Sequence, residues 1–323
     1  MSYVLRPWAE SDAGSDRQIS QAIYPEYREE PDHPAWFPAQ QLGAPREYSS
    51  RYVAVDTRTD QRVGYATLWE LRPRRYRFDL GVRPESLGHG LGGQLFSCVL
   101  NDAQAFGATG VQARVRDDKT EALAFVRRRD FAESHRMGAY RLDIAGEAFA
   151  SAQTFFRELH DSGIEVTTLA AVREEDAHWL ERLYELYSAA REGWPDPDPD
   201  PQGPSAISME QFKSWLDGLR SPEVFFIATH KQQHVGFTSF FGIGTAVHPE
   251  YRGRGIATLL KAGSVADARG RGLRGQTTST ASSAMQRVLE KLGYRRTWSE
   301  VRLLKEAASA QGKPGAGSAP ELH

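Results

Sequence analysis

The second half of this sequence repeats the first, and this repeat constrains the fold more than any other feature. VRPESLGHGLGGQL at 82–95 matches VHPEYRGRGIATLL at 247–260, an offset of 165 (247 minus 82). VGYATL at 63–68 matches VGFTSF at 235–240, and ALAFVRRRDF at 122–131 matches MQRVLEKLGY at 285–294. The pairs keep one order at a nearly constant offset. The chain is therefore predicted to hold two divergent copies of one domain.

The length agrees with this prediction, because 323 residues make two domains of ordinary size. We place the first copy at 1–145, a linker at 146–162 and the second copy at 163–306. Glycine, alanine, proline and serine dominate 307–323, so this tail is expected to be flexible. The linker is expected to be helical near 149–159.

Composition excludes several classes of protein. The net charge of -2 argues against a general electrostatic grip on nucleic acid. The single cysteine excludes an intramolecular disulfide and a cysteine-cluster metal site, and we expect no metal. No apolar run reaches the ~20 residues of a membrane helix, and no signal peptide precedes the first copy. We expect a cytoplasmic protein without nucleic-acid or membrane partners.

Hydrophobic periodicity predicts the same order of elements in both copies. In the first copy we expect strands at 3–6, 51–56, 62–71, 76–82 and 111–115, closing strands within 131–142, and helices at 13–23, 91–106 and 120–129. Asp12 is expected to cap the first helix. In the second copy we expect strands at 166–172, 224–229, 235–241, 244–248 and 275–279, closing strands within 294–304, and helices at 174–190, 209–219, 256–269 and 283–292.

A glycine-rich turn joins a strand to a helix in each copy. In the second copy the strand ends near Val247, and the turn is Arg252-Gly253-Arg254-Gly255. Glycine allows a positive φ and close approach of a ligand, and the first amides of the helix attract an anion. The turn is therefore predicted to bind phosphate, although glycines that only let the helix pack on its strand remain an alternative.

Three kinds of phosphate-binding turn compete for this pattern. A Walker loop ends in Gly-Lys-Ser/Thr, which neither copy has. A dinucleotide-binding turn follows the first strand of a parallel sheet, whereas these turns follow the fourth expected strand of each copy. The third kind is the acyl-CoA loop.

Two motifs resemble those of one family. Arg252-x-x-Gly255-x-Ala257, after Val-x-Pro-x-Tyr, resembles motif A of the GNAT superfamily of acyl-CoA-dependent N-acyltransferases. EALAFVRRRDF at 121–131, and the helix that ends in Leu-Gly-Tyr at 292–294, resemble the family's later motif. The resemblance covers nearly the whole chain, twice. It implies a tandem GNAT protein of the α+β class, each copy being a mixed, mostly antiparallel sheet flanked by helices.

The resemblance also implies acetyl-CoA as the cofactor. The implied binding residues are Val247, Arg252, Gly253, Arg254, Gly255, Ile256 and Ala257 in the second copy, and Val82, Gly88, His89, Gly90, Leu91, Gly92 and Gly93 in the first. We expect the second turn to bind better, because Leu87 replaces the family's leading arginine or glutamine in the first turn.

Other positions depart from the family pattern. The tyrosine that many members use as a general acid corresponds to Val126 and Leu289. The asparagine that often holds the pantetheine arm falls near Asp118 and Ser282. Neither copy therefore carries the usual acid, and only polar substitutes remain for the asparagine.

The activity implied by the resemblance is direct attack of a primary amine on an acyl thioester. A backbone N–H near Val82 or Val247 is expected to serve the carbonyl oxygen. A base must have a suitable pKa and lie within reach. Asp79 in the first copy and His248 in the second are our candidate catalytic residues. Acidic and aromatic segments at 24–37 and 192–205 would suit a cationic small-molecule or peptide amine, unless they are only solvated loops.

Two other functions remain open at this stage. The missing tyrosines also fit a non-catalytic CoA-binding or sensing protein. The glycine turns also fit a nucleotide-binding oxidoreductase. The chain is expected to be a monomer or a homodimer.

Overall fold

The structure is a computed structural model, and it describes residues 3–25, 49–144, 163–191, 207–219, 222–239 and 244–306. The first copy contains strands β1 (Tyr3–Pro7), β2 (Ser50–Asp56), β3 (Gln61–Arg72), β4 (Arg75–Val82), β5 (Gly110–Arg116) and β6 (Ala132–Asp143). Its helices are α1 (Ser15–Ile23), α2 (Leu91–Ala105) and α3 (Thr120–Arg127).

The second copy follows the same order. Its strands are β7 (Ile164–Thr168), β8 (Phe225–His230), β9 (Gln233–Ser239), β10 (Thr245–Val247), β11 (Gly275–Thr280) and β12 (Arg295–Glu306). Its helices are α5 (Leu169–Glu175), α6 (Trp179–Arg191), α7 (Met209–Asp217), α8 (Ile256–Gly270) and α9 (Ser283–Lys291). The predicted linker helix, the tail and most of the two acidic segments lie outside the described residues.

The structure corrects the sequence prediction at the start of both copies. The predicted strand 166–172 ends at Thr168, whose hydroxyl accepts the N–H of Ala171 and so caps α5. The predicted helix 174–190 begins only at Trp179. Asp12 does not cap α1, which begins at Ser15 after Gly14. Its buried carboxylate instead pairs with two arginines.

The ion pairs of Asp12 join three elements of the first copy. Arg6 of β1 approaches one carboxylate oxygen at 2.6 Å, and Arg62 of β3 approaches the other at 2.9 Å. The hydrogen bond from Arg6 holds the pKa of Asp12 well below its usual range, although burial opposes this effect. A cavity of about 310 Å³ between α1 and the β2–β3 turn is lined by Asp12 and Arg62.

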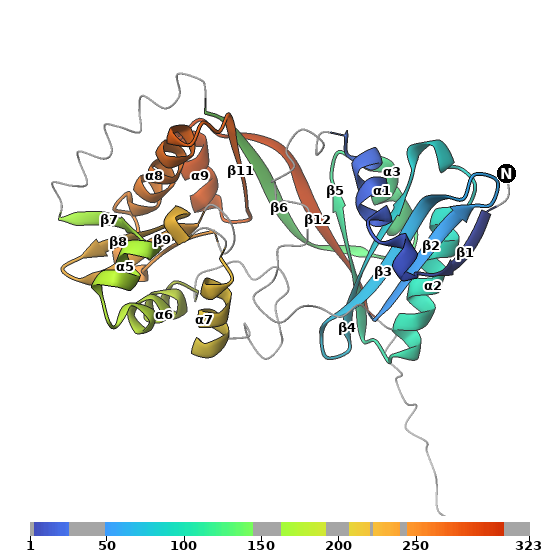
Figure 1. The fold of residues 1–323 in the computed structure, drawn as a ribbon, viewed down its shortest axis with the longest axis horizontal. Helices are drawn as coiled ribbons and strands as arrows, with labels where there is room; N and C mark the ends of the chain where they lie inside the picture. The colour runs from blue at the N-terminus through green and yellow to red at the C-terminus, as the bar shows by residue number, and fades with distance from the viewer. Residues whose placement is uncertain are drawn as a thin grey trace, which may run out of the picture.

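The two copies exchange their last strands. The larger sheet has the order β1-β2-β3-β4-β5-β12-β6-β11, and a second sheet has the order β10-β9-β8-β7. β12, from the second copy, pairs antiparallel with β5 of the first, and β6 of the first copy pairs antiparallel with β11 of the second. Figure 1 shows β6 and β12 side by side, running between the two groups of helices. The sheet therefore crosses the expected boundary between the copies.

This strand exchange places residues of the second copy in the core of the first. Val301 and Leu303 of β12 are fully buried with Leu95, Val99 and Ala113. The other face of β12 carries Glu300, which pairs with Arg114 of β5 at 3.3 Å. The first copy thus completes its sheet with a strand encoded almost at the end of the described chain.

Helices cover both faces of the second sheet. Side chains of α6 and α7 pack with Phe225, Ile227 and Phe237 on one face. Side chains of α8 pack with Ala228 and Val235 on the other. Because strand side chains alternate, Val247 belongs to the α8 face, and His248 directs its side chain toward α6.

Candidate functional site

The two glycine turns have the same backbone conformation. Gly88 and Gly253 have φ of 80° and 78°, and Gly90 and Gly255, which precede α2 and α8, have φ of 78° and 83°. A Cβ at Gly88 or Gly253 would meet no atom within 4 Å. The positive φ, and not crowding, therefore requires glycine. The two turns share this geometry although the first has Leu87 where the second has Arg252.

Each turn leaves backbone amides available to an anion. No side chain caps α2 or α8, and the first intrahelical bonds are those from Gln94 to Gly90 and from Leu259 to Gly255. The amides between them belong to the expected binding residues Leu91, Gly92, Gly93, Ile256 and Ala257, and to Thr258. Leu91 and Ile256 bury their side chains, so only their backbone can contact a ligand. The donor set suits a pyrophosphate.

The two arginines of the second turn are bound to the backbone. Arg252 donates to Ala190 O at 3.0 Å, at the end of α6, and to Val247 O at 3.3 Å. Arg254 donates to Glu250 O at 3.2 Å and stacks 4.8 Å from the ring of Tyr251. Arg252 fixes the turn against α6, and both arginines keep positive charge near it. The exposed Leu87 has no such function.

A cation approaches the first turn from a position that sequence reasoning missed. Arg129, just after α3, lies 3.6 Å from the ring centroid of Phe125 and donates to Phe125 O at 2.8 Å. Its guanidinium would lie 3.6 Å from a Cβ at Gly93. His89 packs its ring against Tyr3, on β1. The first turn therefore has a nearby positive charge although it lacks the motif arginine.

Adjacent strands separate beside the first turn. β4 and β5 pair in parallel only from Arg75–Gly110 to Arg77–Gln112. Beyond Arg77 the two strands diverge, and we call this opening the strand split. In the second copy, β10 pairs with β9 and β11 pairs with β6. At the offset of 165 the counterparts of Arg75–Arg77 are 240–242, which lie outside the described residues.

Backbone amides of β4 face the first strand split. Arg83 N donates to Val63 O at 2.8 Å, so these residues form a hydrogen-bonded pair. Such pairs alternate with non-bonded pairs, so Val82, opposite Gly64, directs its N–H away from β3. His248 N donates to Val235 O at 2.9 Å, which orients Val247 in the same way. The amide of Val82 thus points toward the strand split, and that of Val247 points away from β9.

Asp79 lies on the opposite face of β4 from α2, two residues beyond the last β4–β5 pair. It is half-buried and stands opposite Thr67. Tyr65 lies two residues before Thr67 on β3, and its hydroxyl forms a 3.1 Å hydrogen bond with the hydroxyl of Ser20 of α1. Burial, reinforced by Asp79, raises the pKa of Tyr65 above its usual value. A carboxylate and a protonated phenol therefore lie near the first split, and sequence reasoning missed the phenol.

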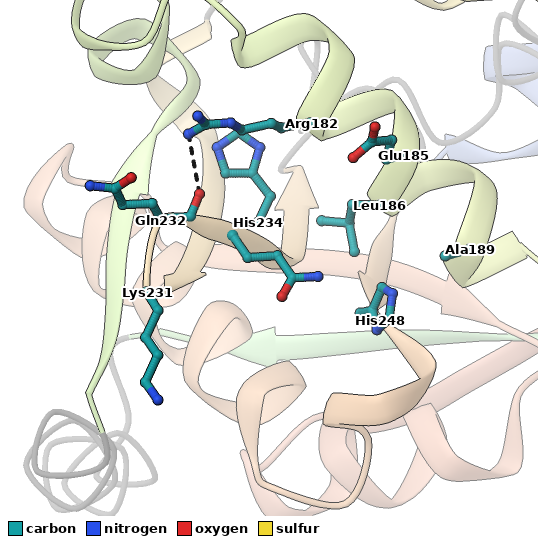
Figure 2. Close-up of a pocket in the computed structure, with 9 residues that line it drawn as sticks. Arg182, Glu185, Leu186, Ala189, Lys231, Gln232, His234 and His248 are labelled. Carbon is teal, nitrogen blue, oxygen red and sulfur yellow. Dashed lines mark hydrogen bonds between the residues drawn. The ribbon is translucent and has the colours of Figure 1, made fainter.

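His248 lines a separate cavity on the α6 side of the second sheet. The cavity has a volume of about 580 Å³ and is lined by Arg182, Glu185, Leu186, Ala189, Lys231, Gln232, Gln233, His234 and His248. Figure 2 shows His248 at one end and Arg182 bonded to Gln232 O at the other. His248 Nδ1 is buried and has no hydrogen-bond partner among the residues that the structure describes.

The residues at the departed family positions have structural roles. Val126 and Leu289 are buried, and no hydroxyl replaces the tyrosine there. Asp118 pairs with Arg116 at 2.5 Å. Ser282 caps α9 by accepting the N–H of Met285. Both side chains therefore already have a partner within the chain, and their part in holding a pantetheine arm stays a prediction.

Both halves thus present a glycine turn of the same conformation that opens a helix with uncapped amides. The family model described as "Acetyltransferase (GNAT) family" matches residues 17–131 and again 180–294. The chain therefore belongs to the GNAT acetyltransferase family and carries two of its domains.

Solved structures share the tandem arrangement. The GCN5-related N-acetyltransferase from Sphaerobacter thermophilus is 18% identical, with a TM-score of 0.69 over 94% of this chain and 95% of that chain. A tandem GNAT protein from the clavulanic acid biosynthesis pathway, solved without AcCoA, is 18% identical, with a TM-score of 0.66 over 95% and 99%. At this identity the likeness shows the fold. No curated protein sequence matches the chain.

Two searches within the described residues returned nothing. None of the helices there is long and apolar enough to span a membrane. No group of three or more histidine, cysteine, aspartate or glutamate side chains in that part of the chain is arranged to hold a metal ion.

Proposed function

We propose that this protein is an N-acyltransferase that uses an acyl-CoA, in the simplest case acetyl-CoA, to acylate a primary amine. The observation that carries the proposal is the matched pair of turns at 87–90 and 252–255, each with uncapped helix amides. The strand split beside the first turn supports it. The membership of the family supports the same reaction.

Acetyl-CoA, when bound, supplies the acyl thioester. The turn amides would hold its pyrophosphate, and the N–H of Val82 or Val247 would stabilise negative charge that develops on the carbonyl oxygen. The amine nitrogen forms its bond to the acyl carbon as the carbon–sulfur bond breaks. The proton lost by the amine finally resides on the thiol.

Asp79 is our candidate for proton removal in the first copy. It lies near the strand split, on the face that α1 covers, and it could reach an amine directly or through one water. Tyr65, kept protonated by its raised pKa, could donate a hydrogen bond on the same face.

The second copy favours a different role. At the offset of 165, Gly244 takes the place of Asp79, and His248 lies in the separate cavity on the α6 side. A non-catalytic CoA-binding role for the second copy therefore remains the alternative. The oxidoreductase reading finds no support, because both turns follow an antiparallel strand meander.

The test is thiol release from acetyl-CoA by the full chain over a panel of amines, together with calorimetric titration of acetyl-CoA. We expect binding and amine-dependent thiol release. Binding without release for any amine would favour the non-catalytic alternative, and absence of binding would overturn the proposal.

A further inference from the structure

Four buried positions on and around α8 are polar in the second copy, whereas their counterparts in the first copy are apolar. Four buried positions correspond through the sequence repeat. They are Phe96, Val99, Val111 and Phe131 in the first copy, and Lys261, Ser264, Gln276 and Tyr294 in the second. Each position is less than a tenth exposed. Four polar replacements within one core are unusual, because unpaired polar groups destabilise an interior.

Three of the polar residues bind one another. Gln276 Nε2 donates to Ser264 Oγ at 2.8 Å, and Tyr294 donates its hydroxyl hydrogen to Gln276 Oε1. These hydrogen bonds give the amide of Gln276 and the two hydroxyl groups a partner inside the protein. They offset part of the free energy that burial of these three polar groups costs.

The ammonium group of Lys261 has no such partner among the described residues. Lys261 is 3% exposed, and no hydrogen bond or ion pair joins it to any residue that the structure describes. Burial lowers the pKa of Lys261 to about 8, and no charged neighbour contributes to the shift. At neutral pH this side chain is still mainly an ammonium group, and an unpaired buried charge strongly favours an anion beside it.

The position of Lys261 relates this charge to the acyl group. Its counterpart Phe96 packs against Phe78, with ring centroids 5.4 Å apart, and Phe78 is the first residue of β4 beyond the last β4–β5 pair. A pantetheine arm held at the turn and running along β4 toward Arg77 would reach this closed end of the strand split. The repeat therefore places Lys261 where the acyl chain of a ligand in the second copy would end.

Resting on the proposed function, we propose that the second copy binds an acyl-CoA whose acyl chain ends in a carboxylate, with the Lys261 ammonium as its counter-ion. A dicarboxylic acid joined to CoA through one carboxyl group has this chemistry. The first copy, with phenylalanines at the same place, would take a short apolar acyl group. The two halves would thus differ in acyl donor.

Succinyl-CoA and butyryl-CoA are a matched pair of probes, because they differ only in a terminal carboxylate against a methyl group. Titration of the full chain should show a site that prefers succinyl-CoA by at least about tenfold, as expected for a desolvated charge pair. In Lys261→Met, which keeps length without charge, the preference should fall to near one. Lys213→Met removes a charge from the exposed face of α7 and should keep the preference.

Lys261→Gln gives a second test if the methionine variant folds poorly, because it retains polarity and also loses the preference. Equal wild-type affinity for the two probes, or a preference that survives in both variants, would overturn this inference. Either result can occur while acetyl-CoA still binds and reacts, whereas loss of all acyl-CoA binding in the wild type would refute the proposed function itself.

Discussion

Replacement of Leu303 by alanine tests the strand exchange directly. Leu303 lies on β12, in the second copy by sequence, yet it is fully buried in the core of the first copy opposite Ala113. Its core neighbours lie on packed strands and on α2, so we expect the space left to be only partly filled by relaxation. Within the range known for buried leucine-to-alanine changes, we expect a loss of about 3 kcal/mol.

Hydrogen exchange read by mass spectrometry locates this loss. Some amides of β5 and α2 exchange only when the core of the first copy unfolds, and these should exchange about a hundredfold faster in Leu303→Ala. The factor follows from the expected loss of about 3 kcal/mol, because 1.4 kcal/mol corresponds to a factor of ten. The matched control is Leu289→Ala, at a buried position of α9 that packs with Val265 and Tyr294. It should accelerate exchange in α8 and α9 more than in β5.

Faster exchange confined to 244–306 in Leu303→Ala, with β5 and α2 as slow as in the wild type, would refute the strand exchange. The copies would then be self-contained, and the pairing of β12 with β5 would be wrong.

Three further predictions concern the turns, a base and an ion pair. Gly255→Ala places a side chain at φ 83°, which costs about 1–2 kcal/mol, so titration should show CoA affinity of the second copy weakened by about fivefold to thirtyfold. Gly270→Ala, at a position without positive φ, should not weaken it. Asp79→Asn should lower kcat by about a hundredfold and leave the acetyl-CoA Kd within about twofold, and an unchanged kcat would remove Asp79 as the base. Asp12→Asn should lower the unfolding free energy at pH 7 by about 3 kcal/mol. Because the pKa of Asp12 is lowered by folding, its contribution is complete above about pH 4 and disappears as the pH falls through the folded-state pKa, so urea unfolding curves of variant and wild type should converge in acid.

The parts of the fold that depend on local sequence could be predicted. The helices after the two turns were expected at 91–106 and 256–269 and lie at 91–105 and 256–270, because glycine punctuation and helical periodicity agree there. The apolar run after Thr168 was misassigned to a strand, because the hydroxyl cap that starts α5 is a weak signal beside four apolar residues.

Features that depend on partners distant in sequence could not be predicted. β6 and β12 each have the pattern of an ordinary closing strand. No local property of either strand tells whether it pairs with β5 of the first copy or with the corresponding strand β11 of the second. The matched turns can be predicted from their glycines, but the attachment of Arg252 to the end of α6 cannot. Arg252 donates to the backbone carbonyl oxygens of Ala190 and Val247, and every residue carries such an acceptor. Lys261 has the sequence appearance of a surface lysine, and only its burial in the folded chain distinguishes it.

The strand exchange has a consequence for synthesis on the ribosome. Arg75 and Glu306 form a 2.6 Å ion pair across 231 positions of the chain. The first half therefore emerges long before the strand that completes it, and until then β5 has an open edge able to pair with other strands. Contacts between such distant positions slow folding, and they prolong the time during which this edge is exposed to aggregation. We expect the nascent first half to need protection, and the order of the two halves in the gene to affect the yield of folded protein.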